Sequence, residues 1–152
     1  MDINPTRLAL AGQMGADHLI TPDKIKEDLL RCTDGKGAET VIISAPVPEL
    51  IDDCIQLTAK GGVCHLSSLK EATEQAQQAA AAQGATLTCA CSSSVGDFKK
   101  CLQLIKEEAI IVSDMISHRF TLETVHEAVE KAATQDLIRG VITFGEMRSV
   151  SF

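Results

Sequence analysis

The sequence predicts an α/β chain built on a mostly parallel sheet, with helices on both faces. Segments with helical periodicity alternate with short strand-like segments along the 152 residues, as in repeated βα units. Residues 40–44 (TVIIS) form a continuous apolar run, which is typical of a strand buried on both faces of a parallel sheet. The length is that of about one domain, and a hydrophobic content of 45% is enough to bury a core.

The first half of the chain alternates predicted helices and strands. Pro5 opens a helix that Gly15 ends, and Thr21 caps a second helix that begins at Pro22. A loop rich in glycine ends this second helix at residues 34–37. Further elements are a helix from Pro46-Val-Pro48 to Leu57, and strands at 18–20, 40–44 and 63–66.

The second half continues the alternation. Residues 70–83 are rich in alanine and glutamine, which favours a helix, although a low-complexity linker is the alternative. In the helix predicted at 95–107, Phe98, Cys101, Leu102 and Ile105 follow the spacing of one buried face. The remaining predictions are strands at 86–90 and 138–144, a strand or extended crossing at 113–120, a helix at 121–132, and a frayed tail at 145–152.

Charge and composition exclude several classes of partner. Lysine and arginine total 14 and aspartate and glutamate total 21, a net charge of −7, which argues against nucleic acid and anionic membranes as partners. No apolar run approaches the roughly 20 residues of a membrane span. The first residues also contain no apolar stretch that could serve as a signal peptide. We therefore expect a cytoplasmic protein.

The six cysteines are expected to be reduced thiols, since nothing in the sequence indicates export. Cys54 and Cys101 fall on apolar helical positions, and buried, inert thiols are the favoured interpretation. A zinc site formed by Cys89, Cys91 and the remote His65 is a weaker alternative, because zinc needs four convergent ligands.

No complete catalytic motif is present in the sequence. The glycine-rich phosphate loops, the nucleophile elbow and the helical zinc-protease motif are all missing. The glycine pairs at 35–37 and 61–62 lie at the ends of predicted helices, where they favour turns over phosphate binding. Residue chemistry alone therefore leads to a soluble α/β domain, with no catalytic residue and no metal ligand assigned.

Five segments, at residues 2–17, 33–43, 57–63, 116–122 and 138–144, occur in an order that resembles the zinc-dependent medium-chain dehydrogenases, and within that family they lean towards the polyol and threonine dehydrogenases. Asp2-Ile-Asn-Pro-Thr-Arg7 followed by Gly15-Ala-Asp17 resembles the end of the second strand of that family's Rossmann domain, its helix, and the turn into the third strand. The other four similar segments are 33–43 (TDGKGAETVII), 57–63 (LTAKGGV), 116–122 (ISHRFTL) and 138–144 (IRGVITF).

The resemblance implies NAD as the cofactor. It implies that Asp2 accepts hydrogen bonds from the adenosine ribose, where a carboxylate also disfavours the 2′-phosphate of NADP. It places Arg7 over the same ribose and Arg139 at the cofactor pyrophosphate. Without the resemblance, Asp2 is an ordinary carboxylate at a helix start and Arg139 a surface charge.

The other implied cofactor residues follow strand ends, where open α/β sheets bind ligands. Ser44 and Ala45 would line the adenine side. Ser67 would lie near the nicotinamide, and Cys91 and Ser92 would lie on the nicotinamide side after the next strand.

The sequence also departs from the family pattern. It begins after the position of the family's first strand and glycine-rich turn, and the zinc ligands belong to an N-terminal catalytic domain that it does not contain. We therefore expect an incomplete Rossmann-like domain at 1–112 and a return segment into the catalytic domain at 113–152.

The expected function is that of the C-terminal part of an NAD-dependent zinc-type alcohol or polyol dehydrogenase, inactive by itself. Two alternatives remain open at this stage. One is a non-catalytic module for nucleotide binding or homo-oligomerisation. The other is a regulatory domain of the receiver type, for which the sequence offers only Asp2 as an acidic residue near the expected site.

Overall fold

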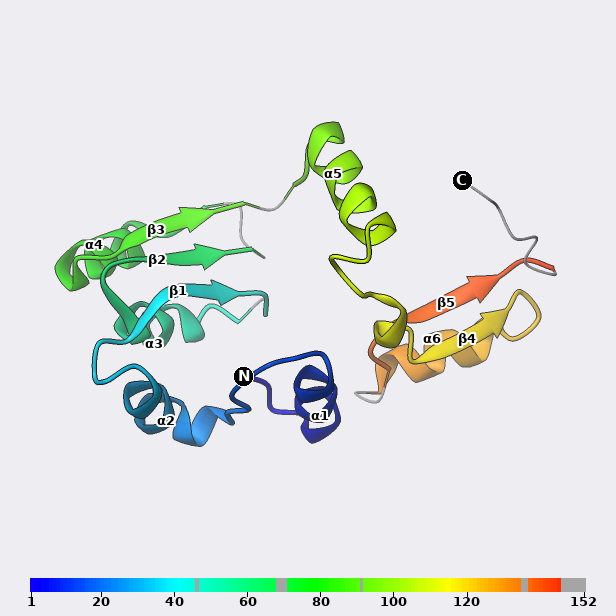
Figure 1. The fold of residues 1–152 in the computed structure, drawn as a ribbon, viewed down its shortest axis with the longest axis horizontal. Coiled ribbons are helices and arrows are strands. Elements are labelled where there is room, and N and C mark those ends of the chain that lie inside the picture. Colours follow the sequence, from blue (N-terminus) through cyan, green and yellow to red (C-terminus); the bar gives the residue numbers. More distant parts are fainter. Residues whose placement is uncertain (46, 68–70, 91, 135–136, 146–152) are drawn as a thin grey trace. The chain divides into compact units, whose positions relative to one another are not determined.

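The computed structural model describes residues 1–45, 47–67, 71–90, 92–134 and 137–145. The chain divides into two compact units, one formed by Met1–Leu19 with Val95–Phe152 and the other by Ile20–Ser94 (Figure 1). Each unit is described by itself below. Among the described helices, none is long and apolar enough to cross a membrane.

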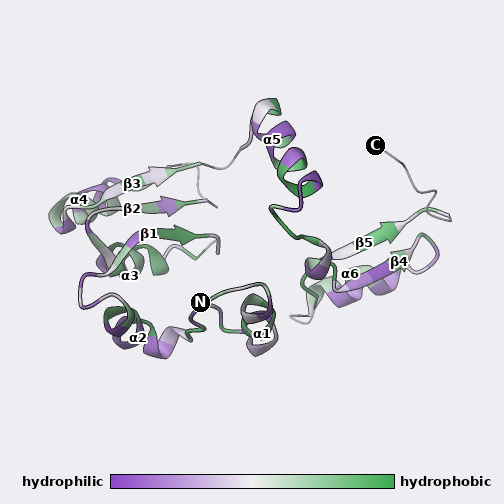
Figure 2. Cartoon of the chain, viewed as in Figure 1, coloured by the Kyte–Doolittle hydropathy of each residue, from purple (hydrophilic) through white to green (hydrophobic). Residues whose placement is uncertain are grey.

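A three-stranded parallel sheet forms the centre of the Ile20–Ser94 unit. The strands β1 (Ala38–Ile43), β2 (Thr58–Leu66) and β3 (Thr86–Cys89) lie in the order β1-β2-β3. Ile43 pairs with Leu66, which in turn pairs with Cys89. The apolar run at 40–44 thus falls almost entirely in β1, which is hydrophobic along most of its length (Figure 2). The predicted parallel α/β architecture is confirmed.

Two helices pack on one face of this sheet. α3 (Leu50–Leu57) contacts β1 and β2, α4 (Glu74–Gln83) contacts β2 and β3, and the two helices also contact each other. Because strand side chains alternate between faces, the residues that face these helices form one core. Its buried members are Ile43, Ile51, Cys54, Ile55, Cys64, Leu66, Ala76 and Ala80.

The alanine-rich segment is a helix rather than a linker. The Thr73 hydroxyl caps α4 by accepting a hydrogen bond from the Ala76 amide (3.2 Å), and Gly84 ends the helix in the left-handed region (φ 73°). Ala76 and Ala80, one turn apart, are buried against the sheet. Small side chains therefore allow α4 to lie close to β2 and β3.

The opposite face of the sheet is more open. Alternation along the strands places Ile42, His65 and Thr88 in one row across this face. The Ile42 side chain is 66% exposed, whereas His65 and Thr88 are half-buried. Before β1 the chain forms the short helix η1 (Pro22–Lys24) and α2 (Ile25–Cys32).

The other unit contains a β-α-β segment and two further helices. β4 (His118–Thr121) and β5 (Gly140–Thr143) pair in parallel, and α6 (Val125–Ala133) contacts both strands. The first part of the predicted 113–120 strand is instead the short helix η2 (Ser113–Met115). The two further helices are α1 (Pro5–Gln13) and α5 (Val95–Lys106).

The strand predicted at residues 18–20 is wrong. These residues have no strand structure, and no described strand lies beside them to supply hydrogen bonds. The Leu19 side chain instead packs against α1, where its Cδ1 lies 3.0 Å from the position that a Cβ on Gly12 would take. An apolar triplet forms a strand only when a neighbouring strand pairs with it.

Candidate cofactor site at the carboxyl edge of the sheet

Four of the predicted cofactor residues follow the three parallel strands of the central sheet. Because β1, β2 and β3 run in parallel, their carboxyl ends meet at one edge (Figure 1). Ser44 and Ala45 follow β1, Ser67 follows β2, and Ser92 lies shortly after β3. The structure therefore brings these four residues to the same edge, whereas Cys91 lies outside the described residues.

Ser67 ties the ends of two strands together. Its hydroxyl donates a hydrogen bond to the Ile43 carbonyl (2.8 Å), and its amide donates to the same oxygen (3.0 Å). On the other side, the Ala90 amide donates to the Leu66 carbonyl (3.2 Å). The backbone at this edge is therefore held in a defined arrangement, as a rigid binding site requires.

The remaining residues at this edge are small and open to solvent. Ser44, Ala45 and Ser92 are all exposed. Serine hydroxyls both donate and accept hydrogen bonds, and short side chains let a flat ligand approach the strand ends. The edge offers polar contacts without any charged group among these four residues.

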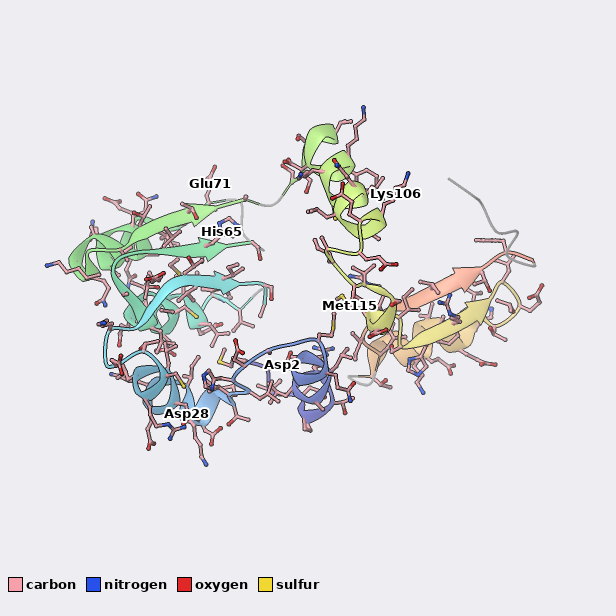
Figure 3. The ribbon with its side chains drawn as sticks, in the orientation of Figure 1. Asp2, Asp28, His65, Glu71, Lys106 and Met115 are labelled. Carbon is pink, nitrogen blue, oxygen red and sulfur yellow. The ribbon has the colours of Figure 1, made fainter. Side chains whose placement is uncertain are left out.

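His65 was not assigned to the site from the sequence. Its Nδ1 lies 2.8 Å from the Thr88 Oγ1, so the two side chains form a hydrogen bond across β2 and β3. Figure 3 shows His65 on β2, and it lies two residues before Ser67. Only the strand register brings His65 and Thr88 together, and the sequence did not provide that register.

Asp2 lies just before α1 in the other compact unit (Figure 3), and Arg7 lies in the first turn of that helix. The Asp2 Oδ1 accepts a hydrogen bond from the Asn4 amide (2.9 Å). The buried Asn4 caps the helix, because its Oδ1 accepts hydrogen bonds from the amides of Thr6 (2.8 Å) and Arg7 (3.3 Å). The Arg7 side chain is exposed. Asp2 thus has a structural contact at one of its two carboxylate oxygens.

Arg139 belongs to the same unit and immediately precedes β5. Its side chain is exposed, and its carbonyl accepts hydrogen bonds from the amides of Ser117 (3.0 Å) and His118 (3.3 Å). The Ser117 hydroxyl in turn accepts hydrogen bonds from the amides of Ile138 (3.0 Å) and Arg139 (3.3 Å). Ser117, which the sequence did not single out, therefore positions the backbone that carries Arg139.

The described cysteines differ in burial: Cys54 and Cys64 are buried, Cys89 is half-buried, and the others are exposed. Burial raises the pKa of the Cys54 thiol to about 11, and the nearby Cys64 and Asp53 add to the shift. Burial also raises the pKa of Cys64, against the effect of a hydrogen bond with Thr58. Both thiols are therefore inert at neutral pH. The expectation of burial is wrong for Cys32 and Cys101, which are both exposed. No residue of α5 is buried, so the apolar face predicted for this helix is not buried either.

A hollow of 670 Å³ lies at the opposite end of β1. Its lining includes Thr33, Lys36, Glu39 and Lys60, near the amino ends of the strands. Open α/β sheets bind their ligands beyond the carboxyl ends of the strands, so the serine-bearing edge is the candidate site. Among the described residues, no three histidine, cysteine or acidic side chains converge in a way that could hold a metal ion.

Comparison with known proteins identifies the family. The family model described as "Zinc-binding dehydrogenase" matches residues 1–107, more than half of the chain. The chain belongs to the zinc-binding dehydrogenases. A curated relative, L-threonine 3-dehydrogenase from Bacillus subtilis, is 30% identical over 137 residues. That match covers 86% of this chain and only 39% of the relative.

Solved dehydrogenase structures share the fold. An oxidoreductase/dehydrogenase of unknown specificity from Escherichia coli matches with a TM-score of 0.82 at 21% identity, over 95% of this chain and 43% of that one. An alcohol dehydrogenase from Thermotoga maritima matches with a TM-score of 0.75 at 18% identity, over 91% of this chain and 40% of that one. A third structure is a short chain alcohol dehydrogenase from Escherichia coli CFT073, solved with NADH. It matches with a TM-score of 0.75 at 18% identity, over 94% of this chain and 43% of that one.

The chain therefore corresponds to the C-terminal portion of a zinc-binding dehydrogenase and spans about two fifths of its relatives' length. The predicted family and the Rossmann-like fold class are both confirmed.

Proposed function

We propose that this chain supplies part of the NAD-binding half of an enzyme that oxidises an alcohol or polyol. The observation that carries the proposal is the convergence of Ser44, Ala45, Ser67 and Ser92 at the carboxyl edge of a parallel sheet in a chain of this family. In this proposal, residues 1–112 belong to the nucleotide-binding part and residues 113–152 return to the catalytic domain.

The residues at the sheet edge suit a dinucleotide. Ser44 and Ala45 would face the adenine side, where an exposed hydroxyl and a methyl group leave space for a flat ring. Ser67 uses its hydroxyl on the Ile43 carbonyl, so it would hold the strand end that borders the nicotinamide rather than bind the ring itself. Cys91 and Ser92 would lie on the same nicotinamide side.

The resemblance also implies cofactor roles for three residues of the other unit. The second carboxylate oxygen of Asp2 would accept hydrogen bonds from the ribose hydroxyls, and Arg7 would cover that ribose. Arg139, held by Ser117, would pair with the pyrophosphate. When bound, NAD accepts a hydride from the alcohol, which is chemistry that the cofactor itself supplies.

Zinc does not fit the described residues as a resident metal. They contain no converging set of histidine, cysteine or acidic side chains, and Cys54 and Cys64 are protonated in the core. We therefore assign no catalytic step to this chain and expect it to be inactive by itself. Reduction of NAD by the purified chain, with a panel of alcohols and polyols as substrates, would show this expectation to be wrong.

Calorimetric unfolding with and without millimolar NAD tests the proposed binding. We expect NAD to raise the unfolding temperature of the unit that carries the sheet, because a ligand that binds only the native state stabilises it. Ser44→Tyr places a bulky ring at the proposed adenine side and should abolish the shift. Thr86→Tyr, at the amino end of β3, is the matched control and should leave the shift intact.

A second measurement addresses cofactor choice. If the Asp2 carboxylate binds the ribose hydroxyls, Asp2→Ser should reduce the rise in unfolding temperature that NAD causes and increase the rise that NADP causes. An equal response of the unaltered chain to both dinucleotides would contradict the role of Asp2. An unfolding temperature that neither NAD nor NADP raises would contradict cofactor binding by the chain alone.

A further inference from the structure

The Ser117 hydroxyl has more hydrogen-bond partners than it can serve at once. Its Oγ lies within hydrogen-bond distance of the Ile138 amide (3.0 Å), the Arg139 amide (3.3 Å), the Arg139 carbonyl oxygen (3.3 Å) and the His118 Nδ1 (2.9 Å). A hydroxyl offers one proton and two lone pairs. The two amides can only donate, so they occupy both lone pairs. The hydroxyl proton is left for either the carbonyl or the imidazole, and the protonation state of His118 decides between them.

A neutral His118 satisfies every group in this set. When Nδ1 carries no proton, it accepts the Ser117 hydroxyl proton over the shortest of the four contacts (2.9 Å). The Arg139 carbonyl is already satisfied, because the amides of Ser117 (3.0 Å) and His118 (3.3 Å) donate to it. The count of donors and acceptors therefore assigns the neutral imidazole the tautomer that carries its proton on Nε2.

A protonated His118 overloads the same hydroxyl. Both ring nitrogens of an imidazolium are donors, so Nδ1–H and the two amides would share two lone pairs. The hydroxyl proton then turns to the Arg139 carbonyl, and one N–H loses its acceptor. The Arg139 amide makes the longest of the three donor contacts (3.3 Å, against 3.0 Å for Ile138 and 2.9 Å for Nδ1), so we expect this amide to be released.

The His118 ring is held beside Ser117 by its packing. It stacks on the ring of Phe120, with the centroids 6.0 Å apart and the planes 10° from parallel. Phe120 is buried, and β4, which carries both rings, contacts α6 and pairs with β5 (Figure 1). The imidazole therefore stays within reach of the hydroxyl in both charge states.

In the described part of the chain, no charged side chain forms an ion pair with His118. The elements around it carry several exposed charged or titratable groups, namely Asp114 on η2, Arg119 on β4, Arg139 before β5, and His126, Glu127, Glu130 and Lys131 on α6. A positive charge on His118 therefore acts first on the Ser117 hydroxyl, which the ring contacts directly.

We propose that His118 is a positioning residue that controls, through Ser117, how firmly the backbone at Arg139 is held. A proton taken up from solvent at Nδ1 releases the Arg139 amide, and loss of that proton restores the bond. The proposal rests on the proposed function, in which Arg139 pairs with the cofactor pyrophosphate. Histidine side chains change charge between about pH 5 and pH 8. The contact of Arg139 with the pyrophosphate should therefore weaken as the pH falls through this range.

Nitrogen-15 NMR of the 152-residue chain between pH 8 and pH 5.5 tests the positioning role without any ligand. At pH 8, the ring nitrogen shifts of His118 should show the tautomer protonated at Nε2. As the ring takes up its second proton, the protection of the Arg139 amide from hydrogen exchange should fall about two- to tenfold, which is the effect of losing one hydrogen bond. This fall should follow the titration of His118 itself.

Three variants separate the proton on His118 from the fold around it. His118→Phe keeps a ring beside Phe120 but cannot titrate, so the Arg139 amide should be as protected at pH 5.5 as at pH 8. Ser117→Ala should remove the pH response of the Arg139 amide while His118 still titrates. His126→Gln is the matched control, because it removes an exposed histidine of α6 in the same unit and should leave the response intact.

Three results would overturn the inference. The first is a neutral His118 with its proton on Nδ1. The second is protection of the Arg139 amide that stays constant from pH 8 to pH 5.5 while His118 titrates. The third is a pH response in Ser117→Ala equal to that of the unaltered chain.

Calorimetry with NAD measures the consequence for the cofactor separately. The rise in unfolding temperature that NAD causes should be smaller at pH 5.5 than at pH 8, and His118→Phe should remove this difference. A larger rise at pH 5.5 would show that the imidazolium attracts the pyrophosphate directly, which would overturn the coupling to Arg139. No rise at either pH would contradict the proposed function, and the NMR result would still support the role of His118 at Arg139.

Discussion

Gly37, in the loop between α2 and β1, requires the absence of a side chain for two reasons. Its φ of 84° lies in the left-handed region, and a Cβ would lie 2.8 Å from the Leu57 carbonyl oxygen. We expect Gly37→Ala to lower the free energy of unfolding by more than the roughly 1–2 kcal/mol of the left-handed conformation alone. Gly35→Ala is the control, because Gly35 has a φ of 79° and open space around it. Urea titrations of the two variants would give the comparison, and equal losses would contradict the close approach.

Cys54 makes stability depend on pH in the alkaline range. Its pKa is about 11 in the folded protein, against 9.0 as its ordinary value. The raised pKa means that the unfolded chain loses its proton first, so the contribution of Cys54 is complete below pH 9 and is lost as the pH rises toward 11. The loss should be on the order of 2 kcal/mol. Urea titrations from pH 8 to 11 measure it, and Cys54→Ala should flatten this dependence.

At the scale of elements, Ser117 connects β4 with the residues that lead into β5. Its hydroxyl accepts hydrogen bonds from the Ile138 and Arg139 amides. Ser117→Ala leaves both donors without this partner, and we expect a loss of about 0.5–1.5 kcal/mol. Faster exchange of these two amides is the measurement. Ser113→Ala, which removes a hydroxyl that donates to the adjacent Asp114 carboxylate, should leave their exchange unchanged.

The helices and strands also show which features of the fold can be predicted from local sequence patterns. The apolar run at 40–44 and the alanine-rich composition of 70–83 are local signals, and they correctly indicated β1 and α4. The strand expected at 18–20 depended on a distant neighbour that no local pattern supplies. The same difference between local and distant signals decides which residues of the candidate site could be predicted. The strand ends at Ser44 and Ser67 were predictable from the order of elements, whereas the pairing of His65 with Thr88 required the register.

At the scale of the whole molecule, the buried core is concentrated in one of the two compact units. Apart from Asn4 and Phe120, the buried residues among those described lie within Ile20–Ser94. Stability should follow this distribution, because protection from exchange depends on buried contacts. We expect amides of β1, β2 and α3 to exchange at least about a hundredfold more slowly than those of α5. Equal protection of α5 would indicate that its apolar face is covered in solution.

The open edge of β1 bears on how the purified chain behaves in the test tube. β1 is an outer strand of the sheet, and no described strand pairs with its outer side. Residues 40–44 combine β-branched side chains, no charge and no proline. Segments of this composition on an exposed edge are templates for amyloid-like growth. The net charge of −7 opposes such growth at low ionic strength. Added salt should therefore shorten the lag before fibrils form, so the solubility of the isolated chain becomes a practical indicator of whether the edge is covered.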